Sequence, residues 1–507
     1  MFKDSAIFRR GEISRSCGTT LWLAGIAIFS ALALSRVPLK LLSVDFVPVF
    51  VVALLFALLL LLGLGSVVAR NGDAIAVVRR LAFLIWWFVL ICEVVFDHTG
   101  SGVESSQGNF SVEAYGEAGM WVLAFGAVVV IALQQRTFLR QLFSGPYKWV
   151  AILALVSVAS CVLSPGKMYS LGWAFKLVLV VLMLQLSAST MFDVEDILAF
   201  LKVTLWAFLI LALVPATIAF SDPATAFEGV GGRLNAGPDA LTLTAASLML
   251  LSTILYSIEK RVTYIIVGLI GTVVMILSLG KTGNIAGIFS AMLFLALQKK
   301  VMRSLGLLLG IAGVGFIIIS VTPVADHLQS YQGASTLTGR TAIWAAGIQG
   351  IKQSPIWGHG YLASYFSFEK SSELLNGANN LHNGFLEVTY NNGIIGLALI
   401  IVIHILIVRG IFRSLRVTSY LRERMPGDRR VAMAHLLTVG VLAIYANLFI
   451  NGLFNTAFGG RAHSAYMLFL AVFFIVQALQ KCTTDLLNSL PSRKGVWRAE
   501  LQLVPTS

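Results

Sequence analysis

Residues 381–412 read LHNGFLEVTYNNGIIGLALIIVIHILIVRGIF, a polar segment that runs directly into an apolar one. The apolar part, residues 393–412, is long enough to cross the ~30 Å hydrocarbon core of a bilayer as a helix. Similar stretches recur along the 507 residues, which are 57% hydrophobic and 12% charged, with a mean hydropathy of +0.85. This composition excludes a soluble globular protein and predicts an all-α polytopic membrane protein.

The sequence contains about fourteen apolar stretches that can each form a transmembrane helix. We divide residues 171–220 and residues 262–298 into two helices each. The stretches lie near residues 19–35, 46–69, 81–96, 119–134, 149–163, 171–188, 197–220, 239–257, 262–280, 283–298, 303–323, 393–412, 431–452 and 463–480.

The basic residues indicate the orientation of the chain. There are 37 Lys and Arg against 24 Asp and Glu, a formal net charge of +13. If the N-terminus is cytoplasmic, all but ten of the 37 fall on the cytoplasmic side, which is the positive-inside bias of inner-membrane proteins. We therefore expect both termini to be cytoplasmic and no nucleic-acid partner. The N-terminus also resembles a cleavable signal peptide, but the charge asymmetry favours an uncut first helix.

The four cysteines lie far apart and show no Cys-x-x-Cys spacing. Neither a zinc site nor a disulfide framework is indicated. No cluster with metal-ligand spacing appears on the expected outer side. We expect no metal and no cofactor.

One connection is far longer than the others and divides the chain into three parts. Residues 1–323 hold the first eleven expected helices, 324–392 form a long non-cytoplasmic loop, and 393–507 hold the last three helices and a cytoplasmic tail. Loops of this length are usually functional or disordered. This one keeps aromatic residues such as Trp344 and Tyr361, so we expect it to be structured against the membrane surface.

Part of this loop has the periodicity of a helix. Arg340, Trp344 and Gly347 share one face of the pattern, and Ser354-Pro355 ends it. Such a helix would lie in the membrane interface, with Trp344 at headgroup depth and Arg340 reaching a phosphate. The alternative is an ordinary amphipathic packing helix.

Ten basic residues run against the topological bias, because they lie on the non-cytoplasmic side or within spans. Cations in such places normally pair with an acid or bind an anionic ligand. The spans hold too few carboxylates for all of them, so an anionic lipid headgroup, particularly a pyrophosphate, explains them best. Arg340, Arg233 and Lys281 are our candidate ligands; for any single residue the alternative is snorkelling to the headgroups. The ten are Arg36, Lys40, Lys167, Lys176, Arg233, Lys281, Arg340, Lys352, Lys370 and Arg461.

Lys281 lies in a Gly-Lys-Thr sequence that superficially resembles a nucleotide-binding loop. Met275 stands where the first glycine of that motif would be. ATP binding is therefore not indicated.

His382 has the chemistry of a general base. The unperturbed pKa of histidine lies near neutrality, so the imidazole can accept a proton from a sugar hydroxyl. Asn383 can orient a neighbour or a sugar, and we count Asn383, Trp344 and Glu387 as candidate substrate-binding residues. If the segment is helical, Glu387 shares a face with Asn383 but not with His382, so it cannot simply orient that ring. For a lone loop histidine, the alternative is a capping or hydrogen-bonded surface residue.

Three motifs in one loop resemble those of the O-antigen ligase and polymerase family of bacterial membrane proteins. The motifs are Leu337-Thr338-Gly339-Arg340-Thr341-x-x-Trp344, Ser354-Pro355-x-x-Gly358-x-Gly360-Tyr361, and His382-Asn383-x9-Gly393-x-x-Gly396. They cover about 60 residues, and Arg233 in a glycine-rich outer loop adds to the resemblance.

The resemblance implies a GT-C-like fold and metal-independent glycosyl transfer with inversion at the anomeric carbon. It implies an undecaprenyl-pyrophosphate-linked glycan as donor, a second glycan as acceptor, a histidine base at His382, and arginines on the pyrophosphate at Arg340 and Arg233. Lys281 departs from the pattern, since an arginine is more common there, as does Asp239 after Gly237-Pro238.

Two activities share this pattern, and the sequence does not decide between them. A polymerase joins one lipid-linked glycan to another, whereas a ligase moves the finished glycan to lipid A-core. The first motif is closest to exopolysaccharide polymerases, which we favour. A lipid-linked glycan transporter is the alternative of another class. A flippase, a chain-length regulator and membrane lipids are the expected partners.

Overall fold

The computed structural model describes residues 74–95, 112–134, 138–220, 238–278, 280–299, 340–367 and 380–489, with the single residues 306 and 310. Within these ranges the regular structure is helical and contains no strand. Six of the described helices are long and apolar enough to cross a membrane. This agrees with the expected polytopic membrane protein.

The helices with described bounds form most of the chain. They are α3 (Ala74–Val95), α5 (Val112–Gln134), α6 (Phe138–Leu142), α7 (Tyr147–Ser160), α8 (Lys167–Ser189), α9 (Val194–Phe220), α10 (Pro238–Glu259), α11 (Val262–Leu277), α12 (Lys281–Leu297), α15 (Arg340–Gln353), α16 (Ala363–Ser367), α17 (Gly384–Arg424), α18 (Arg429–Phe454) and α19 (Ser464–Asn488).

The apolar stretches predicted most of these helices. The two divisions are confirmed, because α8 and α9 are separate helices and so are α11 and α12. The stretches near 19–35, 46–69 and 303–323 lie outside the described residues. The total of about fourteen spans therefore stays a prediction.

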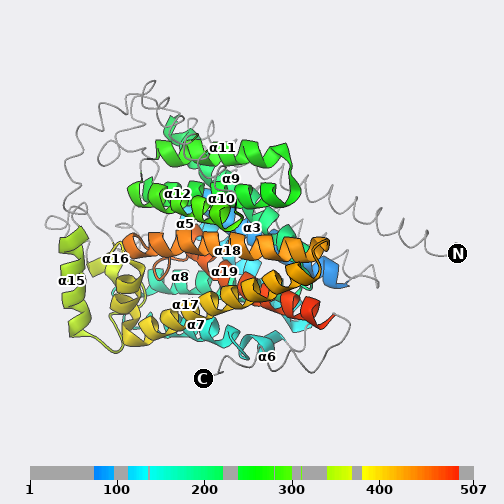
Figure 1. The fold of residues 1–507 in the computed structure, drawn as a ribbon. Coiled ribbons are helices and arrows are strands. Elements are labelled where there is room, and N and C mark those ends of the chain that lie inside the picture. Colours follow the sequence, from blue (N-terminus) through cyan, green and yellow to red (C-terminus); the bar gives the residue numbers. More distant parts are fainter. Residues whose placement is uncertain are drawn as a thin grey trace.

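The long helices pack side by side as a bundle, running roughly horizontally in Figure 1. Of the six candidate spans in the described residues, α19 is the most enclosed: it contacts α8, α17 and α18, and 89% of its apolar stretch is buried. α17 exposes one apolar face that includes Ile401, Ile405 and Phe412. Exposed aliphatic side chains on a helix of this length fit a lipid-facing surface.

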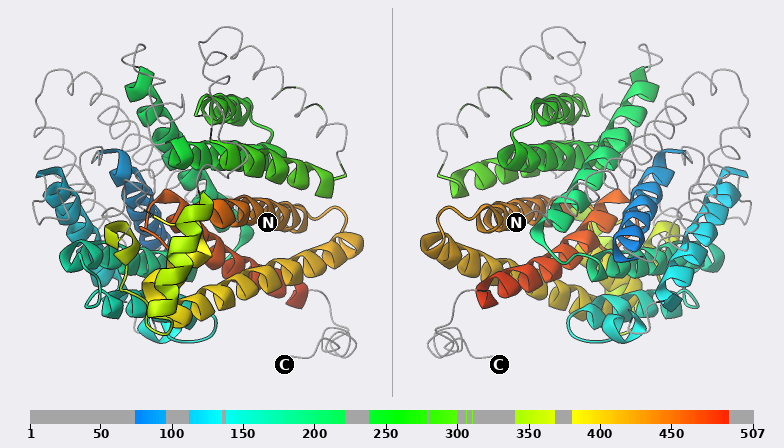
Figure 2. Two further views of the ribbon diagram at one scale, coloured as in Figure 1. Left: turned by 90° about the vertical axis from the view of Figure 1, so that its left-hand side faces the viewer. Right: turned by 90° about the vertical axis from the view of Figure 1, so that its right-hand side faces the viewer.

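α15 and α16 lie at one end of the bundle, where α15 stands across the ends of the long helices (Figures 1 and 2). We call this the α15 end. The connections between α7 and α8 and between α18 and α19 reach it too, since Gly360 packs on the backbone of Ser164 and Arg340 bonds to Asn455. If successive predicted spans cross the membrane in alternating directions, these connections are expected on the same side, and in the structure they meet at one end.

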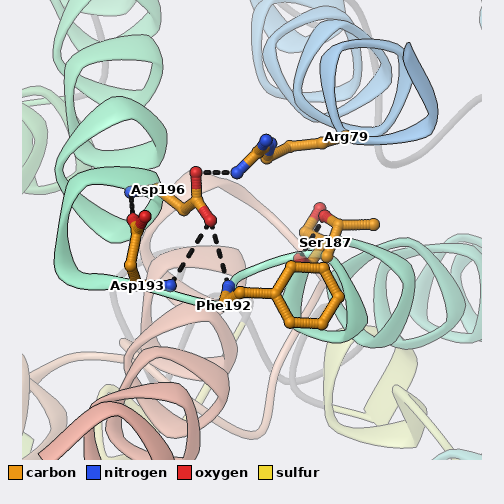
Figure 3. A network of polar contacts seen from close by, with 6 residues as sticks. Arg79, Ser187, Phe192, Asp193 and Asp196 are labelled. Atoms are coloured by element: carbon orange, nitrogen blue, oxygen red, sulfur yellow. Dashed lines mark hydrogen bonds and ion pairs between the residues drawn. The ribbon is translucent and has the colours of Figure 1, made fainter. Parts of the chain in front are cut away.

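The opposite end is held by a polar network around Asp196, in the first turn of α9 (Figure 3). One carboxylate oxygen of Asp196 accepts hydrogen bonds from the backbone N–H groups of Phe192 (3.0 Å) and Asp193 (3.4 Å). The other forms an ion pair with Arg79 of α3, and Asp193 caps the backbone N–H of Asp196 at 2.9 Å. The turn between α8 and α9 is thereby fixed against α3.

α17 is kinked where the expected loop and span meet. It begins at Gly384 rather than at Gly393, and Gly393 has φ 63° and ψ −162°, a conformation open essentially to glycine alone. A Cβ at Gly393 would overlap the carbonyl of Ile356. The kink at Gly393 separates a short first part of α17, residues 384–392, from its long apolar part.

The kink frees backbone groups that the second motif satisfies. The N–H groups of His359 and Gly360 donate to the carbonyls of Tyr390 and Asn391, both at 2.9 Å, and the N–H of Ile394 donates to Pro355 at 2.8 Å. Buried backbone groups need such partners. The Ser-Pro-x-x-Gly-x-Gly motif therefore serves as the hydrogen-bond partner of the kink.

Candidate active site

A partly open cavity of about 210 Å³ lies at the α15 end, beside the start of α17. Its polar wall comes from α16, from the residues just before α17 and from the connection between α18 and α19. The lining residues are Ala240, Leu243, Tyr365, Asn380, His382, Asn455, Thr456, Ala457, Arg461, His463, Ser464 and Ala465. Of the six candidate residues that the structure describes, His382 alone lines it.

His382 is held in an uncommon backbone conformation. Its φ is +46°, in the left-handed region, and its N–H donates to the side-chain oxygen of Asn380 at 2.8 Å. A non-glycine residue in this region is rare, and such conformations cluster at functional sites. The side chain is half-buried and lines the cavity.

Asn383 is the N-cap of α17 rather than a wall of the cavity. Its side-chain oxygen accepts from the N–H groups of Phe385 and Leu386, both at 3.0 Å. Its amide donates to the carbonyl of Leu453 at 2.8 Å. Asn383 therefore joins α17 to the end of α18 and fixes the turn that carries its neighbour His382.

Glu387 is fully buried one turn into α17. It accepts hydrogen bonds from the hydroxyl of Ser364, from the amide of Asn391 (3.2 Å) and from the backbone N–H of Leu381 (3.0 Å). The helical geometry excluded direct orientation of the His382 ring. The carboxylate instead accepts a hydrogen bond from the backbone N–H of Leu381, the residue before His382.

The helix expected to start near Arg340 is confirmed as α15, which ends at Gln353 before the Ser-Pro pair. Arg340 donates to the side-chain oxygen of Asn455 at 3.2 Å, so it contacts a residue of the cavity wall. Trp344 donates its indole N–H to the carbonyl of Leu381 at 2.9 Å, a half-buried contact with the segment before His382. The first and third motifs thus meet in space.

Two candidates remain, Lys281 and Arg233. Lys281 is the exposed first residue of α12 and does not line the cavity. The segment that precedes Lys281 is connected to the wall through α10. The hydroxyl of Ser278 forms a hydrogen bond with that of Thr242, the residue before the wall residue Leu243. Arg233 lies outside the described residues.

Arg461 is a wall residue that the motif analysis left out. It was one of the ten cations that oppose the topological bias, but no motif singled it out. It lies between α18 and α19, directly after Gly459-Gly460. Its guanidinium carbon is 4.3 Å from the centre of the Tyr365 ring. Burial raises the pKa of the Tyr365 phenol, which keeps that ring neutral.

The comparisons with known proteins bear on this same region. A family model described as O-Antigen ligase matches residues 246–401. The resemblance to the O-antigen ligase and polymerase family is confirmed over this segment. The segment includes Arg340, Trp344 and His382 and ends before Arg461.

A curated relative from Rhizobium meliloti (strain 1021) is named exopolysaccharide production protein ExoQ. It is 33% identical over 99 residues, which cover 18% of this chain and 22% of that protein. The chain therefore matches about a fifth of that relative's length. The likeness supports a polysaccharide ligase or polymerase at the coarse level of family.

Proposed function

We propose that the chain is an inner-membrane glycosyltransferase that polymerises undecaprenyl-pyrophosphate-linked oligosaccharide repeat units into exopolysaccharide or O-antigen on the periplasmic side. One observation carries the proposal: His382 lines a cavity at the α15 end whose wall includes Asn455, the partner of Arg340. A histidine in the wall of the cavity and an arginine bonded to that wall match the needs of transfer from a pyrophosphate donor. A GT-C-like fold is part of the proposal.

In the proposed reaction His382 removes the proton from the acceptor hydroxyl. The hydroxyl oxygen forms a new bond to the anomeric carbon of the donor glycan, and the bond from that carbon to the pyrophosphate oxygen breaks with inversion. The leaving group carries the displaced electron pair as undecaprenyl pyrophosphate, and Arg340 and Arg233 stabilise its charge. The donor supplies its own leaving group, so no nucleotide site is needed.

The other proposed residues serve this arrangement. Asn383, Glu387 and Trp344 hold the backbone around His382, and Lys281 adds positive charge at the same end of the bundle. The bound partners are the lipid-linked donor, the glycan acceptor and membrane lipids, with a flippase and a chain-length regulator as protein partners. Transfer is proposed to be metal-independent and to persist in EDTA.

A ligase is the second candidate, because the matching family model is described as O-Antigen ligase. The two differ in their products. Cells that lack a polymerase accumulate single lipid-linked repeats, whereas cells that lack a ligase accumulate long lipid-linked chains.

The test compares glycan products in deletion cells complemented with wild type, His382→Ala or His435→Ala at matched membrane levels. His435 is a matched control, since it bonds Thr418 at the opposite end of the bundle. We expect His382→Ala to abolish long chains and His435→Ala to preserve them. Normal product with His382→Ala would refute the base assignment and favour a transporter.

A further inference from the structure

Arg461 occupies a cage of aromatic rings beside the cavity. Its guanidinium carbon lies 4.3 Å from the ring centre of Tyr365, 5.2 Å from that of Tyr169 and 5.7 Å from that of Trp173. The last two rings belong to α8 and the first to α16. Cation–π contacts of this kind hold a guanidinium in place without using its N–H donors.

The backbone around Arg461 is also fixed. The carbonyl of Gly460 accepts from the hydroxyl of Tyr361 at 3.1 Å, and the carbonyl of Arg461 accepts from the N–H of His463 at 2.8 Å. The position of the side chain is therefore set by several elements rather than by one mobile loop.

The Arg461 side chain is incompletely satisfied within the described part of the chain. Its buried Nε atom has no hydrogen-bond partner there. Glu387 attracts it electrostatically, but the carboxylate already accepts from three donors, and the described ion pairs do not include Arg461. A purely structural arginine normally has its buried donors satisfied.

We propose that Arg461 binds an acidic oxygen group of the substrate, a phosphate or a carboxylate, in the cavity that His382 lines. A forked guanidinium donor suits either oxygen group. The inference rests on the proposed function, because a lipid pyrophosphate is one source of the group and an acidic sugar of the glycan is the other. The aromatic cage makes Arg461 a preorganised anion-binding residue.

The test measures binding rather than transfer, with the full chain in lipid nanodiscs. The probes are undecaprenyl pyrophosphate without glycan, undecaprenyl monophosphate, and an oligosaccharide that contains glucuronic acid. The variants are Arg461→Gln, which removes the charge, and Arg461→Lys, which keeps the charge but loses the fork. Arg140→Gln is the control, because Arg140 of α6 is an exposed cation that does not line the cavity.

We expect Arg461→Gln to weaken binding of one probe by about ten- to hundredfold, the effect of losing a charge-assisted hydrogen bond, with a smaller loss for Arg461→Lys. A loss for the pyrophosphate identifies the donor lipid as the source; a loss for the acidic oligosaccharide identifies the sugar. Arg140→Gln should bind like wild type.

Unchanged binding of every probe by folded Arg461→Lys, or by folded Arg461→Gln, would overturn the inference. Because the readout does not require transfer, this outcome differs from failure of the proposed function, which the glycan products of His382→Ala decide.

Discussion

At the residue scale, the site depends on side chains that hold backbone rather than substrate. Glu387 and Asn383 both bond main-chain groups around His382. The sequence predicted His382 as the candidate general base. It also predicted that Glu387, if the segment is helical, does not orient the His382 ring. It could not predict Arg461 as a wall residue, because the approach of residue 461 to residue 382 is created by the packing of α16, α17 and α19.

Glu387→Gln is expected to lower the free energy of unfolding and the yield of long chains. The change replaces one of the two oxygens that accept from Ser364 and Leu381 by an amide nitrogen, and a buried donor left without its acceptor costs about 1–3 kcal/mol. Thermal unfolding in detergent and glycan analysis measure the two effects. Glu423→Gln, an exposed change near the end of α17, is the control. Equal stability of both variants would contradict the structural role of Glu387.

At the element scale, apolar length predicted the helices well because each span must satisfy its own backbone in lipid. The kink of α17 was not predictable in this way. It depends on one glycine whose conformation is stabilised by a turn that lies more than 30 residues earlier in the chain. The Gly-x-x-Gly motif identified the place but not the geometry.

Gly393→Ala is expected to destabilise the protein by more than about 3 kcal/mol, because alanine at φ 63° is strained and its Cβ overlaps the carbonyl of Ile356. Membrane levels and thermal unfolding check this. Gly427→Ala is the matched control, since a Cβ there meets nothing within 4 Å. Wild-type stability of Gly393→Ala would show that the kink is not required.

Trp344→Phe tests the link between α15 and the His382 segment. The change keeps a ring but leaves the carbonyl of Leu381 without its donor, at a cost of about 1 kcal/mol in unfolding free energy. Polymer yield should fall at near-normal membrane levels. Trp357→Phe, in an exposed tryptophan of the same loop, should leave both unchanged. An equal effect of the two changes would argue against the link.

At the scale of the whole molecule, the two ends of the bundle differ in chemistry. The α15 end holds the cavity, whereas the opposite end holds the exposed arginines at the end of α17 and the start of α18, including Arg416, Arg424 and Arg430. The positive-inside rule predicts that the α15 end is periplasmic.

Single cysteines test this orientation. A cysteine that replaces exposed Lys352 of α15 should react in intact cells with a thiol reagent that does not cross the inner membrane. A cysteine that replaces exposed Arg424 should react only after permeabilisation. The described native cysteines, Cys92, Cys161 and Cys482, are buried, which keeps background labelling low. The reverse labelling pattern would invert the topology.

The hydrogen bonds that join the α17 kink to the turn at residues 355–360 have a consequence for how the gene diverges. Gly358 and Gly393 each face the other segment's backbone: a side chain at Gly358 would meet the carbonyl of Asn391, and one at Gly393 the carbonyl of Ile356. Each overlap is independent of the other, so descendants that keep the kink should keep both glycines.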